Sequence, residues 1–240
     1  MAKRSKRREP VQGALPFRPG RGGARRGAGR KPKGMVAGVS HLQREQLSGR
    51  VPVHVTMKLR GGLPKLRQRE EYQALRGAFA AGCDKGVRGG GRFRLCHYAV
   101  LNDHLHFVVE AEDRDTLARG LQGLLIRIAR ALNKLWGRKG KVFADRYHSR
   151  SLKTPKEVRH ALRYVLGNGK KHAAEGRHVT VSQAIDTFTS APWFDGFAET
   201  FTVRGIETVV RPITDAKTWM LTLGWKRHGL LSVHELPATA

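Results

Sequence analysis

Residues 94–109 read RLCHYAVLNDHLHFVV, and this stretch decides the fold. Two apolar segments flank the dipeptide Asn102-Asp103, which is typical of a β-hairpin. Side chains alternate between the two faces of a strand, so His104 and His106 share one face and the apolar residues that alternate with them share the other. Two imidazoles on one face can bind a single divalent metal ion. The stretch therefore predicts an antiparallel hairpin that carries candidate metal ligands.

The chain carries a large excess of positive charge. Its 240 residues include 46 Lys and Arg but 19 Asp and Glu, which gives a formal net charge of +27. Such an excess favours a polyanionic partner, because each neutralised phosphate releases condensed counterions. A ribosome or an anionic membrane surface would attract the same charge. The composition therefore predicts a class of partner and not a reaction.

The cysteines and the hydropathy pattern bear on location. Cys83 and Cys96 form no CxxC pair, so neither a disulfide framework nor a cysteine zinc site is expected, and a reducing cytoplasm fits. No apolar run approaches the ~18–20 residues of a membrane span. The basic N-terminus has no apolar core behind it, unlike a signal peptide. We therefore expect a cytoplasmic protein with no membrane partner.

The chain divides into three parts by composition. Residues 1–49 are rich in Gly, Arg and Lys and poor in apolar residues, which predicts a disordered basic tail. Within it, Arg30 and Lys31 could enter a DNA minor groove, as basic arms do, although a solvated linker is the other interpretation. Residues 50–175 hold the clear strand and helix patterns and are expected to form the domain that carries the candidate metal ligands. Residues 176–240 are less regular, and their tryptophans indicate a small packed extension.

Periodicity and capping signals predict the order β-α-β-β-α-β-α, an α+β fold with an antiparallel sheet packed with helices. Strands are expected at residues 51–60 and 140–148, and helices at residues 65–81, after Asp113 or Asp115, and after the capping box at 154–157. Several arginines are candidate DNA contacts outside the tail. They are Arg127, Arg130, Arg146 and Arg163. A solvated helix face is the other interpretation for the pair on the long helix.

The last of these helices carries a tyrosine off its apolar stripe. At about 100° per residue, Tyr164 lies on the flank of the stripe, and Asn168 lies one turn further on the same side. A phenol, a side-chain oxygen and two imidazoles are what metal-assisted transesterification of a phosphodiester requires. An ordinary surface tyrosine and two core histidines remain the alternative interpretation.

These motifs together resemble a known family. His104-Leu105-His106 resembles the HUH motif (histidine, bulky hydrophobic residue, histidine). The run 163–168, RYVLGN, resembles the tyrosine helix of single-tyrosine HUH transposases, especially the prokaryotic group associated with repetitive extragenic palindromes. The resemblance covers about residues 50–172 and includes a first strand, the hairpin, a long basic helix, a Gly-x-x-Phe segment and the tyrosine helix, in that order.

The resemblance implies a ferredoxin-like fold and a DNA transposase that cuts and rejoins single-stranded or hairpin DNA. It implies Tyr164 as the nucleophile of a 5′-phosphotyrosine intermediate, with Mg²⁺ or Mn²⁺ bound by His104, His106 and Asn168. It also implies a nucleoid-associated prokaryotic protein and, as in some relatives, a homodimer. The sequence departs from the family at residues 101–103, Leu-Asn-Asp in place of Met-Pro-Asn, and at Gly169 in place of proline. The second departure loosens the third ligand and leaves another residue, such as His172, open for that role.

Two other interpretations remain. One is a nucleic-acid-binding relative without catalysis. The other is a two-histidine RNA phosphoesterase, because residues 54–56 and 178–180 are both His-Val-Thr tripeptides. Such a histidine pair would act as acid and base without a metal.

Overall fold

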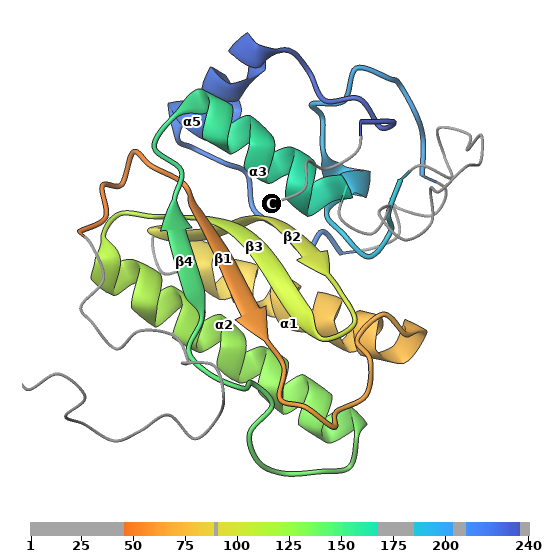
Figure 1. Cartoon of the computed structure of the whole chain (residues 1–240). Coiled ribbons are helices and arrows are strands. Elements are labelled where there is room, and N and C mark those ends of the chain that lie inside the picture. The colour runs from red at the N-terminus through yellow and green to blue at the C-terminus, as the bar shows by residue number, and fades with distance from the viewer. Residues whose placement is uncertain (1–45, 89–90, 168–184, 204–209, 236–240) are drawn as a thin grey trace, which may run out of the picture. The chain divides into compact units, whose positions relative to one another are not determined.

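The computed structural model describes residues 46–88, 91–167, 185–203 and 210–235 (Figure 1). Nearly all of the predicted N-terminal tail therefore lies outside the described residues, with Arg30 and Lys31. So do Asn168 and the tripeptide at 178–180. No described helix is long and apolar enough to cross a membrane.

The described part of the chain holds a four-stranded antiparallel sheet. Its strands are β1 (Val53–Lys58), β2 (Phe93–Val100), β3 (His104–Ala111) and β4 (His148–Ser151), in the order β2-β3-β1-β4. With one helix after β1 and another after β3, this is the β-α-β-β-α-β topology of ferredoxin-like folds. The predicted α+β fold class is confirmed.

Helices cover both faces of the sheet (Figure 1). Helices α1 (Arg69–Arg88) and α2 (Arg114–Leu135) pack on one face, with the apolar residues of β3 that alternate with the histidines. Helix α3 (Pro155–Gly167) packs on the other face, where Val108 of β3 joins a second core. The histidines of β3 therefore lie on the α3 side, because alternation places them opposite the first core.

Local signals account for where these elements begin. Asp113 is the N-cap of α2 and accepts a hydrogen bond from the Thr116 amide, as one of the two predicted caps requires. The predicted capping box of α3 is also confirmed. The Thr154 hydroxyl accepts from the Glu157 amide at 3.2 Å, and the Glu157 carboxylate accepts from the Thr154 amide at 3.2 Å.

Several predicted boundaries are wrong, and one is the end of helix α1, which lies at Arg88 rather than 81. The strand expected over 140–148 is a loop with one antiparallel bridge, between Phe143 and Leu59, and β4 begins only at His148. Val142 is buried and packs in the first core, so an apolar alternation arises there without a strand of its own. Helix α1 begins at Arg69 rather than 65, because the Leu66 amide donates to the Asn102 carbonyl of the hairpin turn. That turn spans 101–103, one residue longer than expected.

The described C-terminal residues complete the second core. They contain the short helices η2 (Ala191–Trp193), α5 (Trp219–Thr222) and η3 (Gly224–His228). Trp225 is 1% exposed and packs among the apolar residues of α3. Polar contacts add to this apolar packing and join the extension to the sheet. The buried Glu110 of β3 accepts from the Arg94 side chain and from the amides of Lys217 and Thr218.

Ion pairs fix the outer side of α3 to the same extension. Arg159 donates to both carboxylate oxygens of Glu235, at 2.8 and 3.0 Å, and Arg163 donates to the same carboxylate at 2.9 Å. Arg159 also donates to the backbone carbonyls of Gly229 and Leu230. The tyrosine helix is therefore held between the sheet on one side and the C-terminal residues on the other.

His97 makes the stability of the fold sensitive to acid. Its imidazole is 8% exposed on β2, with Nδ1 3.3 Å from the Ser190 hydroxyl and its ring against the edge of Phe194. Burial lowers the pKa of His97 from 6.5 to about 4. The folded protein thus excludes the charged ring at a pH where the unfolded chain already binds the proton. Its contribution is complete above about pH 6.5 and is lost as the pH falls toward 4.

We therefore expect His97→Gln to flatten the pH dependence of stability. Between pH 7 and pH 5 the wild-type free energy of unfolding should fall by about 2 kcal/mol more than that of the variant, since each bound proton contributes about 1.4 kcal/mol per pH unit. Urea unfolding at both pH values measures this difference. An identical fall in the two proteins would mean that His97 is not held neutral by the fold.

Candidate functional site

Strand register brings polar side chains from three strands to one face of the sheet. Thr56 of β1 is opposite His106 of β3, and on its other side it is opposite His148 of β4. His54 is opposite Arg150 of β4. Opposed residues of antiparallel strands project from the same face. These side chains therefore all face α3.

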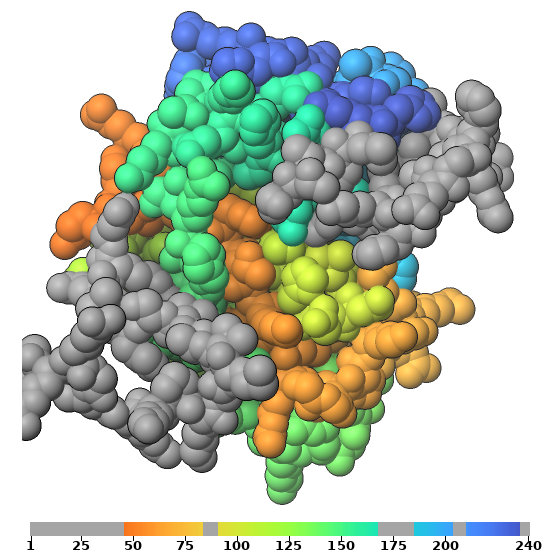
Figure 2. All heavy atoms as spheres, viewed as in Figure 1, coloured from red at the N-terminus to blue at the C-terminus, as the bar shows by residue number. Residues whose placement is uncertain are grey.

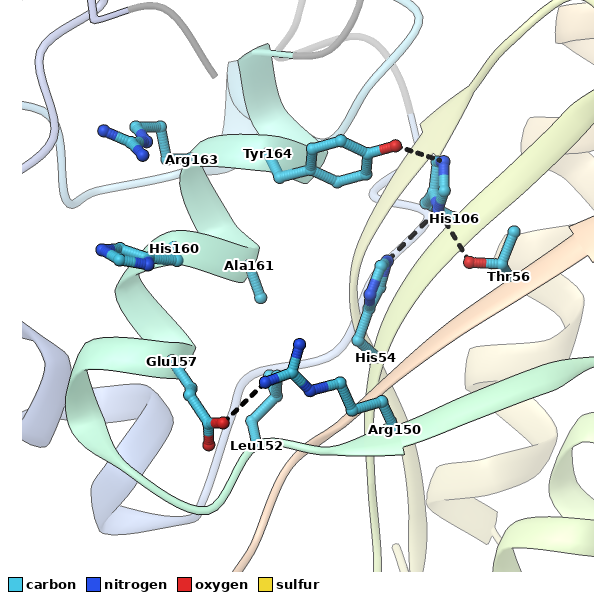
Figure 3. Close-up of a pocket in the computed structure, with 10 residues that line it drawn as sticks. All are labelled: His54, Thr56, His106, Arg150, Leu152, Glu157, His160, Ala161, Arg163 and Tyr164. Atoms are coloured by element: carbon cyan, nitrogen blue, oxygen red, sulfur yellow. Dashed lines mark hydrogen bonds and ion pairs between the residues drawn. The ribbon is translucent and has the colours of Figure 1, made fainter. Parts of the chain in front are cut away.

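His106 lies at the centre of this face. Its Nδ1 is 3.2 Å from His54 Nε2 and 3.1 Å from the Thr56 hydroxyl, and its Nε2 is 3.5 Å from the Tyr164 hydroxyl (Figure 3). The His54 and His106 rings are stacked at 5.2 Å, and the Tyr164 ring meets His106 edge-on at 5.0 Å. Residues from β1, β3 and α3 thus meet around one imidazole.

His104 is next to His106 on β3, with the two ring centroids 4.9 Å apart. Its Nδ1 donates to the Asp103 carboxylate at 2.7 Å, and this hydrogen bond lowers the pKa of Asp103. Asp103 belongs to the turn in which the sequence departs from the HUH pattern. The departure therefore provides a carboxylate that orients the first histidine.

The two rings have the hydrogen-bond partners that metal-binding histidines have. Metal-binding histidines generally use one ring nitrogen for the ion and the other for an orienting carboxylate, carbonyl or hydroxyl. The Nδ1 atoms of His104 and His106 have such partners, which leaves both Nε2 atoms as donors. Burial, then the neighbouring His54 and His104, lowers the pKa of His106 to about 3. The ring is therefore neutral near pH 7, as ligation requires.

A metal site needs further ligands besides His104 and His106. Within residues 46–88, 91–167, 185–203 and 210–235, no group of three or more His, Cys, Asp or Glu side chains could hold a metal ion. The expected third ligand, Asn168, is the first residue beyond the described part of α3. The described residues thus supply two imidazole donors, and the third ligand stays a prediction.

The apolar stripe of helix α3 orients Tyr164 toward the histidines. The buried side chains of α3 are those of the predicted stripe, Val158, Ala161, Leu162, Val165 and Leu166. Tyr164 is half-buried on the flank of that stripe, as the sequence predicted. Figure 3 shows its ring reaching from α3 to His106. The packing of the neighbouring apolar stripe therefore sets the position of the phenol.

A pocket of about 350 Å³ extends from Tyr164 and His106 between α3 and the sheet (Figure 3). Arg150 of the edge strand β4 crosses it and donates to Glu157 at 2.7 Å. Figure 2 shows that β4, β1 and the β2–β3 turn are exposed on the same face of the molecule as α3. Within the site, Arg150 is exposed, His54 and Thr56 are half-buried, and His106 is buried.

The other predicted DNA contacts within the described residues differ in where they lie relative to this site. Arg127 and Arg130 lie on α2, against the opposite face of the sheet, and Arg127 donates to the Gly123 carbonyl of its own helix. Arg146 is exposed in the loop before β4. Arg163 lines the pocket but is paired with Glu235. Their contacts with DNA stay predictions.

Three residues of the site were not among the predicted ligands or nucleophile, namely His54, Thr56 and Arg150. The alternation of residues 51–60 places His54 and Thr56 on one face, which was the available signal. The position of Arg150 had no such signal, because β4 was expected elsewhere. His54 and Thr56 also form the first of the two His-Val-Thr tripeptides, and here both contact His106.

Comparison with known proteins finds similarity to a solved structure and not to a family or a curated sequence. No protein-family model matches the chain, and no curated protein is significantly similar to it. The solved structure of a REP-associated tyrosine transposase bound to a REP hairpin is similar in fold, with a TM-score of 0.47 and 20% identity. The match covers 63% of this chain and 82% of that one. A likeness of this size assigns no function, which has to come from the residues of the site.

Proposed function

We propose that this protein is a DNA strand transferase of the single-tyrosine HUH type, which cuts and rejoins single-stranded DNA at or near a hairpin. The observation that carries the proposal is the 3.5 Å approach of the Tyr164 hydroxyl to His106 Nε2, between residues 58 positions apart in sequence. A phenol beside one of two candidate metal-ligand imidazoles suits the phosphodiester transesterification that we propose. The net charge of +27 suits a polyanionic substrate.

The proposed chemistry is a reversible exchange of one ester bond. The Tyr164 phenol loses its proton to solvent, and its oxygen attacks the phosphorus of the scissile phosphate. A bond between phosphorus and the tyrosine oxygen forms while the bond to the 3′ oxygen breaks, and that oxygen takes up a proton. The 5′ phosphate stays on Tyr164, so a 3′ hydroxyl can reverse the step and rejoin the strand.

The chain's own residues would hold the reacting groups. His104 and His106 would bind Mg²⁺ or Mn²⁺, which when bound polarises the phosphate and offsets charge on its oxygens. Asp103 and Thr56 orient those rings through their Nδ1 atoms. The ion pairs between α3 and Glu235 restrain the helix that carries the phenol.

End-labelled hairpin oligonucleotides with single-stranded flanks test the proposal. In Mg²⁺ or Mn²⁺ we expect an adduct that survives denaturing electrophoresis and carries the 3′ label, while the 5′-labelled fragment is released with a free 3′ hydroxyl. Tight, salt-sensitive binding with no cleavage would instead support a binding protein. Cleavage that persists in EDTA and is lost in His54→Ala would support the two-histidine phosphoesterase.

A further inference from the structure

The pocket beside Tyr164 has walls of different chemistry. His54 and Tyr164 contribute planar rings, whose centroids are 5.9 Å apart at one end. Leu152 and Ala161 contribute apolar surface, and Arg150 with its partner Glu157 forms the other end (Figure 3). Rings and apolar surface next to a cation are what an unstacked nucleotide contacts, with its base on the rings and its phosphate on the cation.

Arg150 is available for a phosphate. Its side chain is 64% exposed, and one of its terminal nitrogens donates to Glu157. A guanidinium has five N–H donors in a planar fork, so most of its donors remain for an anion. Glu157 is itself fixed at the start of α3, where it accepts from the amides of Lys153 and Thr154. The Glu157 carboxylate therefore holds Arg150 at the pocket and uses only part of its hydrogen-bond donors.

The size of the pocket limits what can enter. At about 350 Å³ it is near the lower end for small-molecule sites and cannot admit a duplex. One nucleotide taken out of a stack, as in base-flipping enzymes, suits both the volume and the walls. Because the pocket begins at Tyr164 and His106, that nucleotide would be next to the phosphate that the phenol attacks.

We propose that this pocket binds a single unpaired nucleotide flanking the scissile phosphate, with its base against the rings of His54 and Tyr164 and its outer phosphate on Arg150. The substrate class follows, since both the strand and this nucleotide must be unpaired where Tyr164 acts. The inference rests on the proposed function for the position of the scissile phosphate. The pocket itself can be tested without cleavage.

The test uses an oligonucleotide of ten thymidines in which one central position is 5-iododeoxyuridine. Light cross-links it to the Tyr164→Phe protein, which is expected not to cleave it. We expect mass spectrometry to place the cross-link at His54 or at position 164. Adding Arg150→Ala should lower the yield about tenfold, as expected for loss of a charge-assisted hydrogen bond. Arg211→Ala is the matched control, because Arg211 also pairs with a carboxylate at 2.8 Å but lies outside the pocket. It should leave the yield unchanged.

A second oligonucleotide tests which phosphate contacts Arg150. A neutral methylphosphonate on one side of the iodinated nucleotide should lower the yield about tenfold with Arg150 present and have no effect in Arg150→Ala. Cross-links that map outside the pocket, or equal yields from the Arg150→Ala and Arg211→Ala proteins, would overturn the subsite. An adduct on hairpin DNA with such a result leaves the proposed function standing. Pocket cross-links without any adduct refute the function and keep the subsite.

Discussion

Tyr164→Phe is expected to remove the covalent protein–DNA adduct, by at least about 10³-fold, and to leave hairpin affinity within about twofold. The substitution deletes the one oxygen that can form the phosphotyrosine and keeps the ring that packs on His54 and His106. Denaturing electrophoresis with a 3′-labelled hairpin measures the adduct, and fluorescence anisotropy measures the affinity.

The lost hydroxyl should have little effect on stability. Its one described contact, with His106, is 3.5 Å long, at the limit of a hydrogen bond. Thermal unfolding of the variant should therefore match the wild type within a few degrees. Tyr147→Phe is the control, because Tyr147 packs against the first core on the other side of the sheet. Equal adduct yields from wild type and Tyr164→Phe would refute the nucleophile assignment, and loss of the adduct in Tyr147→Phe would show that the effect is structural.

Local sequence patterns predicted most of the strand and helix positions that hold the site residues. The alternation of residues 104–109 placed the histidines on one face of β3, and the stripe of α3 placed Tyr164 on its flank. The capping box gave the start of α3 at Pro155. Each of these depends on a periodicity of two or 3.6 residues, which the sequence displays directly.

What the sequence could not predict depends on contacts between distant segments. Strand register decides that Thr56 and His54 meet His106, and no periodicity reveals which strands pair. Arg150 was missed because the apolar alternation around Val142 predicted the strand too early in the sequence. Val142 is apolar because it packs in the first core. The C-terminal residues showed no clear period because their helices are only three to five residues long. They are joined to the rest by apolar packing around Trp225 and by polar contacts such as Glu110 with Thr218 and Arg159 with Glu235. Such contacts leave no repeat in the sequence.

His106→Ala is expected to weaken Mn²⁺ binding by at least about 100-fold and to abolish metal-dependent cleavage. The substitution removes one of the two described imidazole donors, and Mn²⁺ is the better probe because Mg²⁺ strongly prefers oxygen ligands. Isothermal titration with MnCl₂ measures the affinity without DNA. Since His106 is 4% exposed and its loss leaves a cavity, His104→Ala at the more exposed partner provides a second variant with the same expected loss.

His54→Ala separates ligation from orientation. His54 contacts Nδ1 of His106 and not the nitrogen that faces Tyr164, so its loss should weaken Mn²⁺ binding by about 10-fold without abolishing it. The Thr56 hydroxyl, 3.1 Å from the same Nδ1, would still orient the ring. Unchanged Mn²⁺ affinity in both His104→Ala and His106→Ala would remove the metal from the site. A loss in His54→Ala as large as in His106→Ala would instead make His54 a ligand, and the stacked pair of imidazoles would have to rearrange around the ion.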